Sequence, residues 1–142
     1  MIPEFRDDGF LPEGLHKASK SEVLFRFGTT TRQRRRLALR LKRWIELAFA
    51  IDAIRLVVDG SFVTSKSEPN DIDAVMQIPP NFRQLVGDQI DEAVELESMF
   101  LSRQPQEIFA AEDDDDWNAW IEFFSRTRTS DGRRKGLIEI EL

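Results

Sequence analysis

The sequence contains no cysteine and only one histidine, His16, in its 142 residues. Without cysteine, the chain cannot form a disulfide, a thiolate metal site or a cysteine nucleophile. One histidine gives little material for a Ser-His-Asp triad or a histidine-rich zinc site, so we interpret His16 as a surface or packing residue. A catalytic site in this protein would therefore consist mainly of carboxylates, hydroxyls and basic side chains.

Long apolar runs and a signal-peptide pattern are also missing from the sequence. We therefore expect no membrane partner and, with cysteine absent as well, a cytoplasmic protein. The formal net charge of −6 argues against broad binding to nucleic acid, so we expect no DNA partner. This charge does not exclude a polyanionic substrate, because bound divalent cations would reverse the local sign.

The composition is that of a globular chain, with 41% apolar residues that include eleven phenylalanines and three tryptophans. The length predicts a single domain, residues 1–142, that can bury a sizeable core. We expect residues 1–18 to be irregular, because proline and glycine recur in this segment. Apolar periodicity and capping residues predict helices and strands in the rest of the chain. The expected helices are 19–28, 30–51, 82–99 and the segment after 113–116; the expected strands are 54–58, 71–78, 106–111 and 136–142.

These elements predict an α/β (α+β) fold, with a small, mixed, twisted sheet and helices packed mainly on one face.

The helix at 30–51 should begin with a capping box formed by Thr30 and Gln33. Its basic residues between Arg34 and Arg43 have two interpretations: a solvated face, which is favoured, or a ridge for RNA or an acidic partner. The acidic run 113–116 also has two interpretations, a helix cap and a calcium site. The helix cap is favoured, because an EF-hand loop needs alternating ligands and a central glycine.

The segment 54–76 carries the strongest functional pattern. A short apolar strand leads to Gly60 and Ser61, a polar loop follows, and a second strand starts with Asp71 and Asp73. Side chains at i and i+2 of a strand point to the same face, so the two carboxylates should lie together. Gly60 would let a phosphate approach the backbone, Ser61 could donate to a phosphate oxygen, and Lys66 could reach the terminal phosphates. The segment therefore predicts a metal site beside a phosphate site.

This segment resembles the nucleotidyltransferase superfamily, whose members have the polymerase-beta-like fold. In the shared signature, a hydrophobic residue is followed by Gly and then by either Gly or Ser. After a spacer, which has nine residues here, come Asp, a hydrophobic residue, Asp or Glu, and a second hydrophobic residue. A third carboxylate follows later in the chain. The motifs GSFVTSK and PNDID are similar to those of a family of small bacterial nucleotidyltransferase-like proteins. The opening FLPEGLHKAS and the closing KGLIEIEL are similar to that family as well. The sequence departs from the signature at Asp59, where a hydrophobic residue is expected, and at Ala74, a weak hydrophobe.

The resemblance implies catalysis by two Mg²⁺ ions that carboxylates hold against the phosphates of a nucleoside triphosphate. Asp71 and Asp73 would be two of the metal ligands and catalytic residues. Glu107 falls where the superfamily's third strand is expected and is the favoured third ligand; Glu139 and Glu141 are its competitors. The resemblance thus implies a minimal nucleotidyltransferase domain that binds nucleotide through Gly60, Ser61 and Lys66.

Two functions are compatible with these patterns. The first is a Mg²⁺-dependent nucleotidyltransferase that moves a nucleoside monophosphate from an NTP to a hydroxyl of a protein or RNA acceptor. The alternative is a non-catalytic nucleotide- or partner-binding module of a bacterial toxin–antitoxin or phage-defence pair. A third carboxylate close to the aspartate pair would favour the enzyme, and one far from the pair would favour the module.

Overall fold

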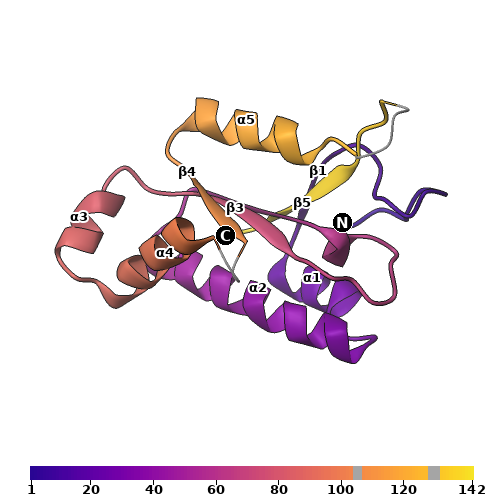
Figure 1. Cartoon of the computed structure of the whole chain (residues 1–142), viewed down its shortest axis with the longest axis horizontal. Coiled ribbons are helices and arrows are strands. Elements are labelled where there is room, and N and C mark those ends of the chain that lie inside the picture. Colours follow the sequence, from indigo (N-terminus) through magenta and orange to yellow (C-terminus); the bar gives the residue numbers. More distant parts are fainter. Residues whose placement is uncertain (104–106, 128–131) are drawn as a thin grey trace.

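The computed structural model describes residues 1–103, 107–127 and 132–142 (Figure 1). Its elements, in order, are β1 (Gly14–Ala18), α1 (Lys20–Phe27), α2 (Arg32–Ala50), β2 (Arg55–Asp59), the 3₁₀ turn η1 (Ser61–Val63), β3 (Asp73–Gln77), α3 (Phe82–Gly87), α4 (Asp91–Ser102), β4 (Ile108–Ala111), α5 (Asp114–Phe124) and β5 (Gly136–Ile140).

The strands form one mixed sheet in the order β1-β5-β2-β3-β4. The outer pairs β1–β5 and β3–β4 are parallel, whereas β2 is antiparallel to both of its neighbours. Helices α1 and α2 lie on one side of the sheet and α5 on the other (Figure 1). The predicted α+β class is confirmed, and β2 and β3 form its central hairpin.

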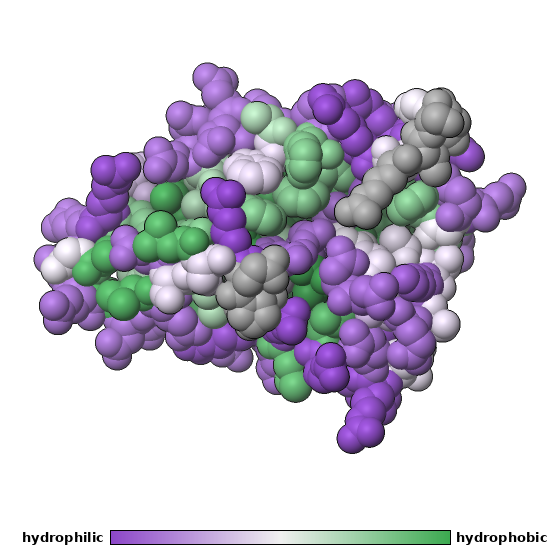
Figure 2. All heavy atoms as spheres, in the orientation of Figure 1, coloured by the Kyte–Doolittle hydropathy of each residue, from purple (hydrophilic) through white to green (hydrophobic). Residues whose placement is uncertain are grey.

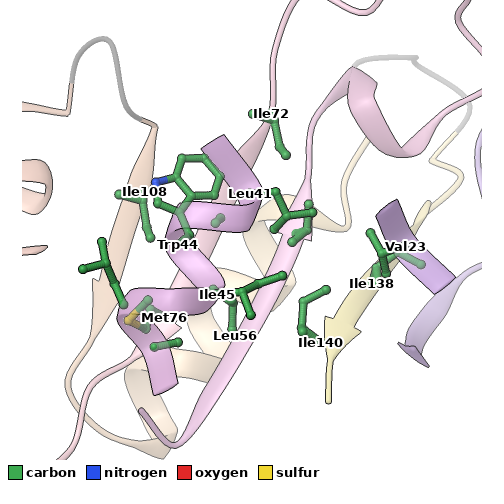
Figure 3. Close-up of a cluster of buried hydrophobic side chains, with 14 of the residues drawn as sticks. Val23, Leu41, Trp44, Ile45, Leu56, Ile72, Met76, Ile108, Ile138 and Ile140 are labelled. Carbon is green, nitrogen blue, oxygen red and sulfur yellow. The ribbon is translucent and has the colours of Figure 1, made fainter. Parts of the chain in front are cut away.

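Helix α2 supplies one side of the main core. Its residues Leu41, Trp44 and Ile45 recur at helical spacing and are fully buried. They face side chains of the sheet such as Met76 and Ile108 (Figure 3). Burying each large aliphatic side chain contributes about 1.5–3 kcal/mol, so this layer fixes the sheet on α2.

A second, smaller cluster lies on the opposite face of the sheet. Val57, Val75 and Leu137 pack there against Trp117 of α5. The side chain of Asp113 accepts a hydrogen bond of 2.7 Å from the Asp116 amide at the start of this helix. The interpretation of the acidic run as a helix cap is therefore confirmed.

Three sequence-based predictions of local structure are wrong. Residues 1–18 include strand β1, which pairs with the far end of the chain, a contact that no local pattern encodes. Helix α2 is capped by Thr31, whose side chain accepts from the Arg34 amide, and not by Thr30. The helix expected at 82–99 is two helices, because Gln89 adopts φ 58° between α3 and α4.

The break between α3 and α4 changes which apolar side chains are buried. Ile90 and Val94, which would lie on the apolar face of one continuous helix over 82–99, are 39% and 43% exposed. Apolar side chains are visible at the end of the molecule where α3 and α4 lie (Figure 2). Within the described ranges, the helices are all too short or too polar to cross a membrane.

Candidate metal centre

Three neighbouring strands carry an acidic residue at the same end and on the same face of the sheet. Asp59 ends β2 and lies directly opposite Asp73, the first residue of β3. Beyond Asp73, the Ala74 amide donates a 3.0 Å hydrogen bond to the carbonyl of Glu107, which precedes β4. Side chains alternate along a strand, so these carboxylates share the face of Val57 and Val75, which α5 covers. The sheet thus forms an acidic row, Asp59–Asp73–Glu107, just beyond the apolar cluster under α5.

Asp71, which lies two residues before the start of β3, is close to this row. One carboxylate oxygen each of Asp71, Asp73 and Glu107 lies within 4.8 Å of the other two. Two oxygens bound to one Mg²⁺ at ~2.1 Å can be at most about 4.2 Å apart, so small side-chain rotations would allow all three to bind one ion. The donor set is all oxygen, as a hard cation prefers, and fits Mg²⁺. In the described parts of the chain this is the one such group of three.

The negative charges of the row are poorly solvated. Burial raises the pKa of Asp73 to about 9, assisted by a hydrogen bond with Glu107 and by the nearby charges of Asp71, Glu107 and Asp59. Like charges on directly opposed strand positions destabilise one another, so Asp73 retains a proton at neutral pH when no cation is bound. A divalent cation at this position would offset the repulsion.

A buried ion pair limits the charge at one end of the row. Lys135 Nζ lies 2.9 and 2.8 Å from the two carboxylate oxygens of Asp59. Burial still raises the pKa of Asp59, against the effect of this lysine. The sequence marked Asp59 only as a departure from a motif and did not single out Lys135, because the partners are 76 residues apart.

Gly60 and Ser61 hold the carboxylates in place. Gly60 has φ 90° and ψ 179°, a backbone region almost restricted to glycine, and a Cβ there would lie 3.0 Å from the Asp71 carbonyl oxygen. The Gly60 amide donates to the Asp59 carboxylate. The Ser61 amide donates to Asp71 Oδ1 at 3.0 Å, and the Ser61 hydroxyl donates to the same oxygen. In the structure, the groups predicted to contact phosphate therefore bind carboxylates of the site.

Arg34 fixes the loop that follows this turn. Its buried guanidinium donates to the carbonyls of Phe27 (3.1 Å), Phe62 (2.7 Å), Thr64 (2.8 Å) and Lys66. Arg34 is thus a structural residue and not part of a surface ridge on α2. Lys66 itself is exposed, and its side chain lies beside the site.

An open cleft of about 680 Å³ lies over the acidic row. Its volume is in the range of small-molecule sites. Asp59, Asp71 and Asp73 line it together with residues of other segments. They are Asp8, Gly9, Phe10, Gly60, Ser61, Thr64, Ser65, Lys66, Asn70, Phe123, Phe124, Arg126, Thr127 and Lys135. Five of the six residues predicted for the site thus line one cleft, and Glu107 contacts Asp73 from the side.

The two competing carboxylates are elsewhere. Glu139 lies opposite Val57, toward the other end of β2, and its oxygens accept hydrogen bonds of 3.0 and 2.8 Å from Arg55. That guanidinium also covers the Trp117 ring at 4.6 Å. Glu141 follows β5 and is exposed. The antiparallel pairing of β5 with β2 is what directs Glu139 away from the row.

Comparison with known proteins gives a single relationship. No curated protein and no solved structure matches the chain significantly. One family model matches residues 3–141, nearly the whole chain. The protein therefore belongs to the DUF6932 family, which is described as a family of unknown function.

Proposed function

We propose that this protein is a Mg²⁺-dependent nucleotidyltransferase that transfers a nucleoside monophosphate from an NTP to an acceptor hydroxyl. The observation that carries the proposal is the convergence of Asp71, Asp73 and Glu107 within 4.8 Å on the floor and side of an open cleft. The resemblance of segment 60–73 to the nucleotidyltransferase signature supports the same reaction.

The residues of the chain have separate roles in this proposal. Asp71 and Asp73 would hold the metal, with Ser61 fixing the orientation of Asp71. Glu107 would complete the set beside Asp73. When bound, Mg²⁺ would neutralise phosphate charge and activate the attacking hydroxyl. Lys66, which lines the cleft, would reach the terminal phosphates as a mobile cation.

The proposed reaction is an in-line displacement at the α-phosphorus of the NTP. The acceptor oxygen forms a bond to this phosphorus, and the bond from the phosphorus to the oxygen of the β-phosphate breaks. Pyrophosphate leaves, and the hydroxyl proton passes to a carboxylate of the row. The proposed acceptor is a separate protein or RNA.

The test replaces the aspartate pair by its neutral isosteres. Asp71→Asn with Asp73→Asn should abolish Mg²⁺-dependent NTP binding, measured by calorimetry, and the release of pyrophosphate in the presence of an acceptor. The fold should persist, because both changes remove mutual repulsion at the site. Unchanged NTP affinity in the double variant would refute the metal site.

A second comparison tests the third ligand. Glu107→Gln should weaken Mg²⁺ binding at least tenfold, since one of three protein ligands is lost. Glu141→Gln, at an exposed position, is the matched control and should bind Mg²⁺ normally. The opposite ranking would remove Glu107 from the site. Because Glu107 lies close to the aspartate pair, we favour the enzyme over a non-catalytic module of a toxin–antitoxin or phage-defence pair.

A further inference from the structure

The wall of the cleft formed by α5 has no role in the chemistry proposed above. Phe123 and Phe124 line the cleft at the end of this helix. Phe123 is 58% exposed. Two other phenylalanines, Phe25 and Phe49, are also exposed, but they do not line the cleft. Single exposed apolar side chains are common, so the position of Phe123 in the cleft is what distinguishes it.

Neighbouring rings fix the orientation of Phe123. It lies edge-on to Phe124, with ring centroids 5.2 Å apart at 81°, and edge-on to Trp120, at 6.2 Å and 85°. Trp120 and Phe124 stack on each other at 5.8 Å, and Trp120 also stacks on Phe109 of β4 at 4.8 Å. Apolar side chains are visible over α5 in the space-filling view (Figure 2). The exposed ring is therefore held by a packed aromatic cluster and is ordered before any ligand binds.

A short series of contacts connects this ring to the acidic row. Ser125, which follows Phe124, accepts a 2.8 Å hydrogen bond from the Lys135 amide. The Lys135 side chain reaches Asp59 at 2.8 Å, and Asp59 lies directly opposite Asp73. The aromatic wall and the carboxylates thus belong to one cleft and are connected by these contacts, with an apolar side and an acidic side.

We propose that Phe123 is the platform on which the base of the bound nucleotide stacks while its phosphates face Asp71 and Asp73. This inference rests on the proposed function. A nucleotide has an anionic end that requires metal or cations and a flat aromatic end that requires an apolar face. The cleft offers both, and an ordered exposed ring gains contact with a base without first losing conformational freedom.

The experiment compares two kinds of Mg²⁺-bound ligand, with and without a base. These are the four common ribonucleoside triphosphates and ribose 5-triphosphate, which carries no base. The wild-type protein should bind at least one nucleoside triphosphate more tightly than ribose 5-triphosphate. Phe123→Ala should weaken that binding about 5- to 100-fold and leave the affinity for ribose 5-triphosphate unchanged.

Two further variants complete the design. Phe49→Ala removes an equally exposed ring from α2 and should change neither affinity. Phe123→Trp should retain nucleoside triphosphate binding, because it restores a flat ring. Circular dichroism of each variant checks the fold.

The outcomes separate the two proposals. If the wild type binds neither ligand with Mg²⁺, the proposed function fails and the stacking platform fails with it. If the wild type binds both but Phe123→Ala leaves nucleoside triphosphate affinity unchanged, only the platform is overturned. Equal losses for both ligands would also overturn it, since they would indicate a structural role of the ring.

Discussion

At the scale of single residues, Asp73 has a strongly altered acidity, with its pKa raised to about 9. It is the central member of the acidic row, between Asp59 on one strand and Glu107 beside the next, with Asp71 two residues away. Lys135 offsets Asp59 only, at the end of the row. Asp73 therefore depends on a proton or a cation for its stability in the folded chain.

The raised pKa of Asp73 gives a prediction for stability against pH. Its pKa is about 9 in the folded chain, against an ordinary value of 3.8 for an aspartate carboxyl, so the folded state retains a proton that the unfolded state releases. The stabilising contribution is complete below pH 3.8 and is lost as the pH rises through 9. Without metal, the free energy of unfolding should fall over this window by up to about 1.4 kcal/mol per pH unit. Urea unfolding at pH 5, 6, 7 and 8 measures the slope.

Asp73→Asn should flatten that slope, because the amide does not titrate. Saturating Mg²⁺ should also flatten it, since the cation replaces the proton. Asp88→Asn, at an exposed position, is the control and should keep the wild-type slope. Identical slopes for Asp73→Asn and the wild type would contradict the assignment to this residue.

At the scale of elements, the first turn of α2 holds the loop between η1 and β3. Thr31 donates to the Ser67 carbonyl at 3.3 Å, and Gln33 donates to the Pro69 carbonyl at 3.0 Å. Arg34 binds three further carbonyls of this region, at Phe62, Thr64 and Lys66. The helix that carries the core thus also positions the loop beside the acidic row.

Arg34→Met tests this link. The change leaves four carbonyls without their charged donor and should cost about 3 kcal/mol of unfolding free energy, measured in urea. Amide hydrogen exchange at residues 62–65 should accelerate more than exchange in β2. Arg35→Met is the matched control: Arg35 is exposed and donates one bond, to the Thr29 carbonyl, so its loss should cost under about 1 kcal/mol. Equal effects of the two changes would argue against the proposed role of Arg34.

At the scale of the whole molecule, the two faces of the sheet are covered to different extents. The face under α1 and α2 is covered by the main core and fixes the strands. The face under α5 is only partly covered, and the acidic row and the cleft lie where the cover ends. The end of the sheet face where the cover stops thus holds the carboxylates in a fixed array, with Asp59 buried and Asp73 partly exposed to the cleft.

Ligand binding to this cleft should stabilise the entire fold. Mg²⁺ with an NTP at one hundred times the dissociation constant should add about 2.7 kcal/mol to the free energy of unfolding and raise Tm by several degrees. Thermal unfolding followed by fluorescence measures this shift. NTP without Mg²⁺ should give a smaller shift, and the Asp71→Asn/Asp73→Asn variant should give none. A shift that is the same with and without Mg²⁺ would disagree with a metal-dependent site.

Features encoded by neighbouring residues could be predicted from the sequence. Ser19 and Glu22, spaced three residues apart as a capping box requires, cap the start of α1 with both hydrogen bonds at 3.1 Å. The apolar spacing of α2 identified its buried face, and the spacing of Asp71 and Asp73 placed them together. In each case, the information lies within one or two turns or strand repeats, where local geometry determines which side chains meet.

The sequence by itself therefore determined the class of the fold, the buried face of α2 and the aspartate pair. The tertiary structure decided which acid lies beside that pair. The parallel pairing of β3 with β4 places Glu107 next to Asp73, whereas the antiparallel pairing of β5 with β2 places Glu139 against Arg55. The tertiary structure also brought Lys135 next to Asp59 and placed Phe123 in the wall of the cleft. Strand register and contacts between distant segments depend on packing of the whole chain, which no local pattern of residues specifies.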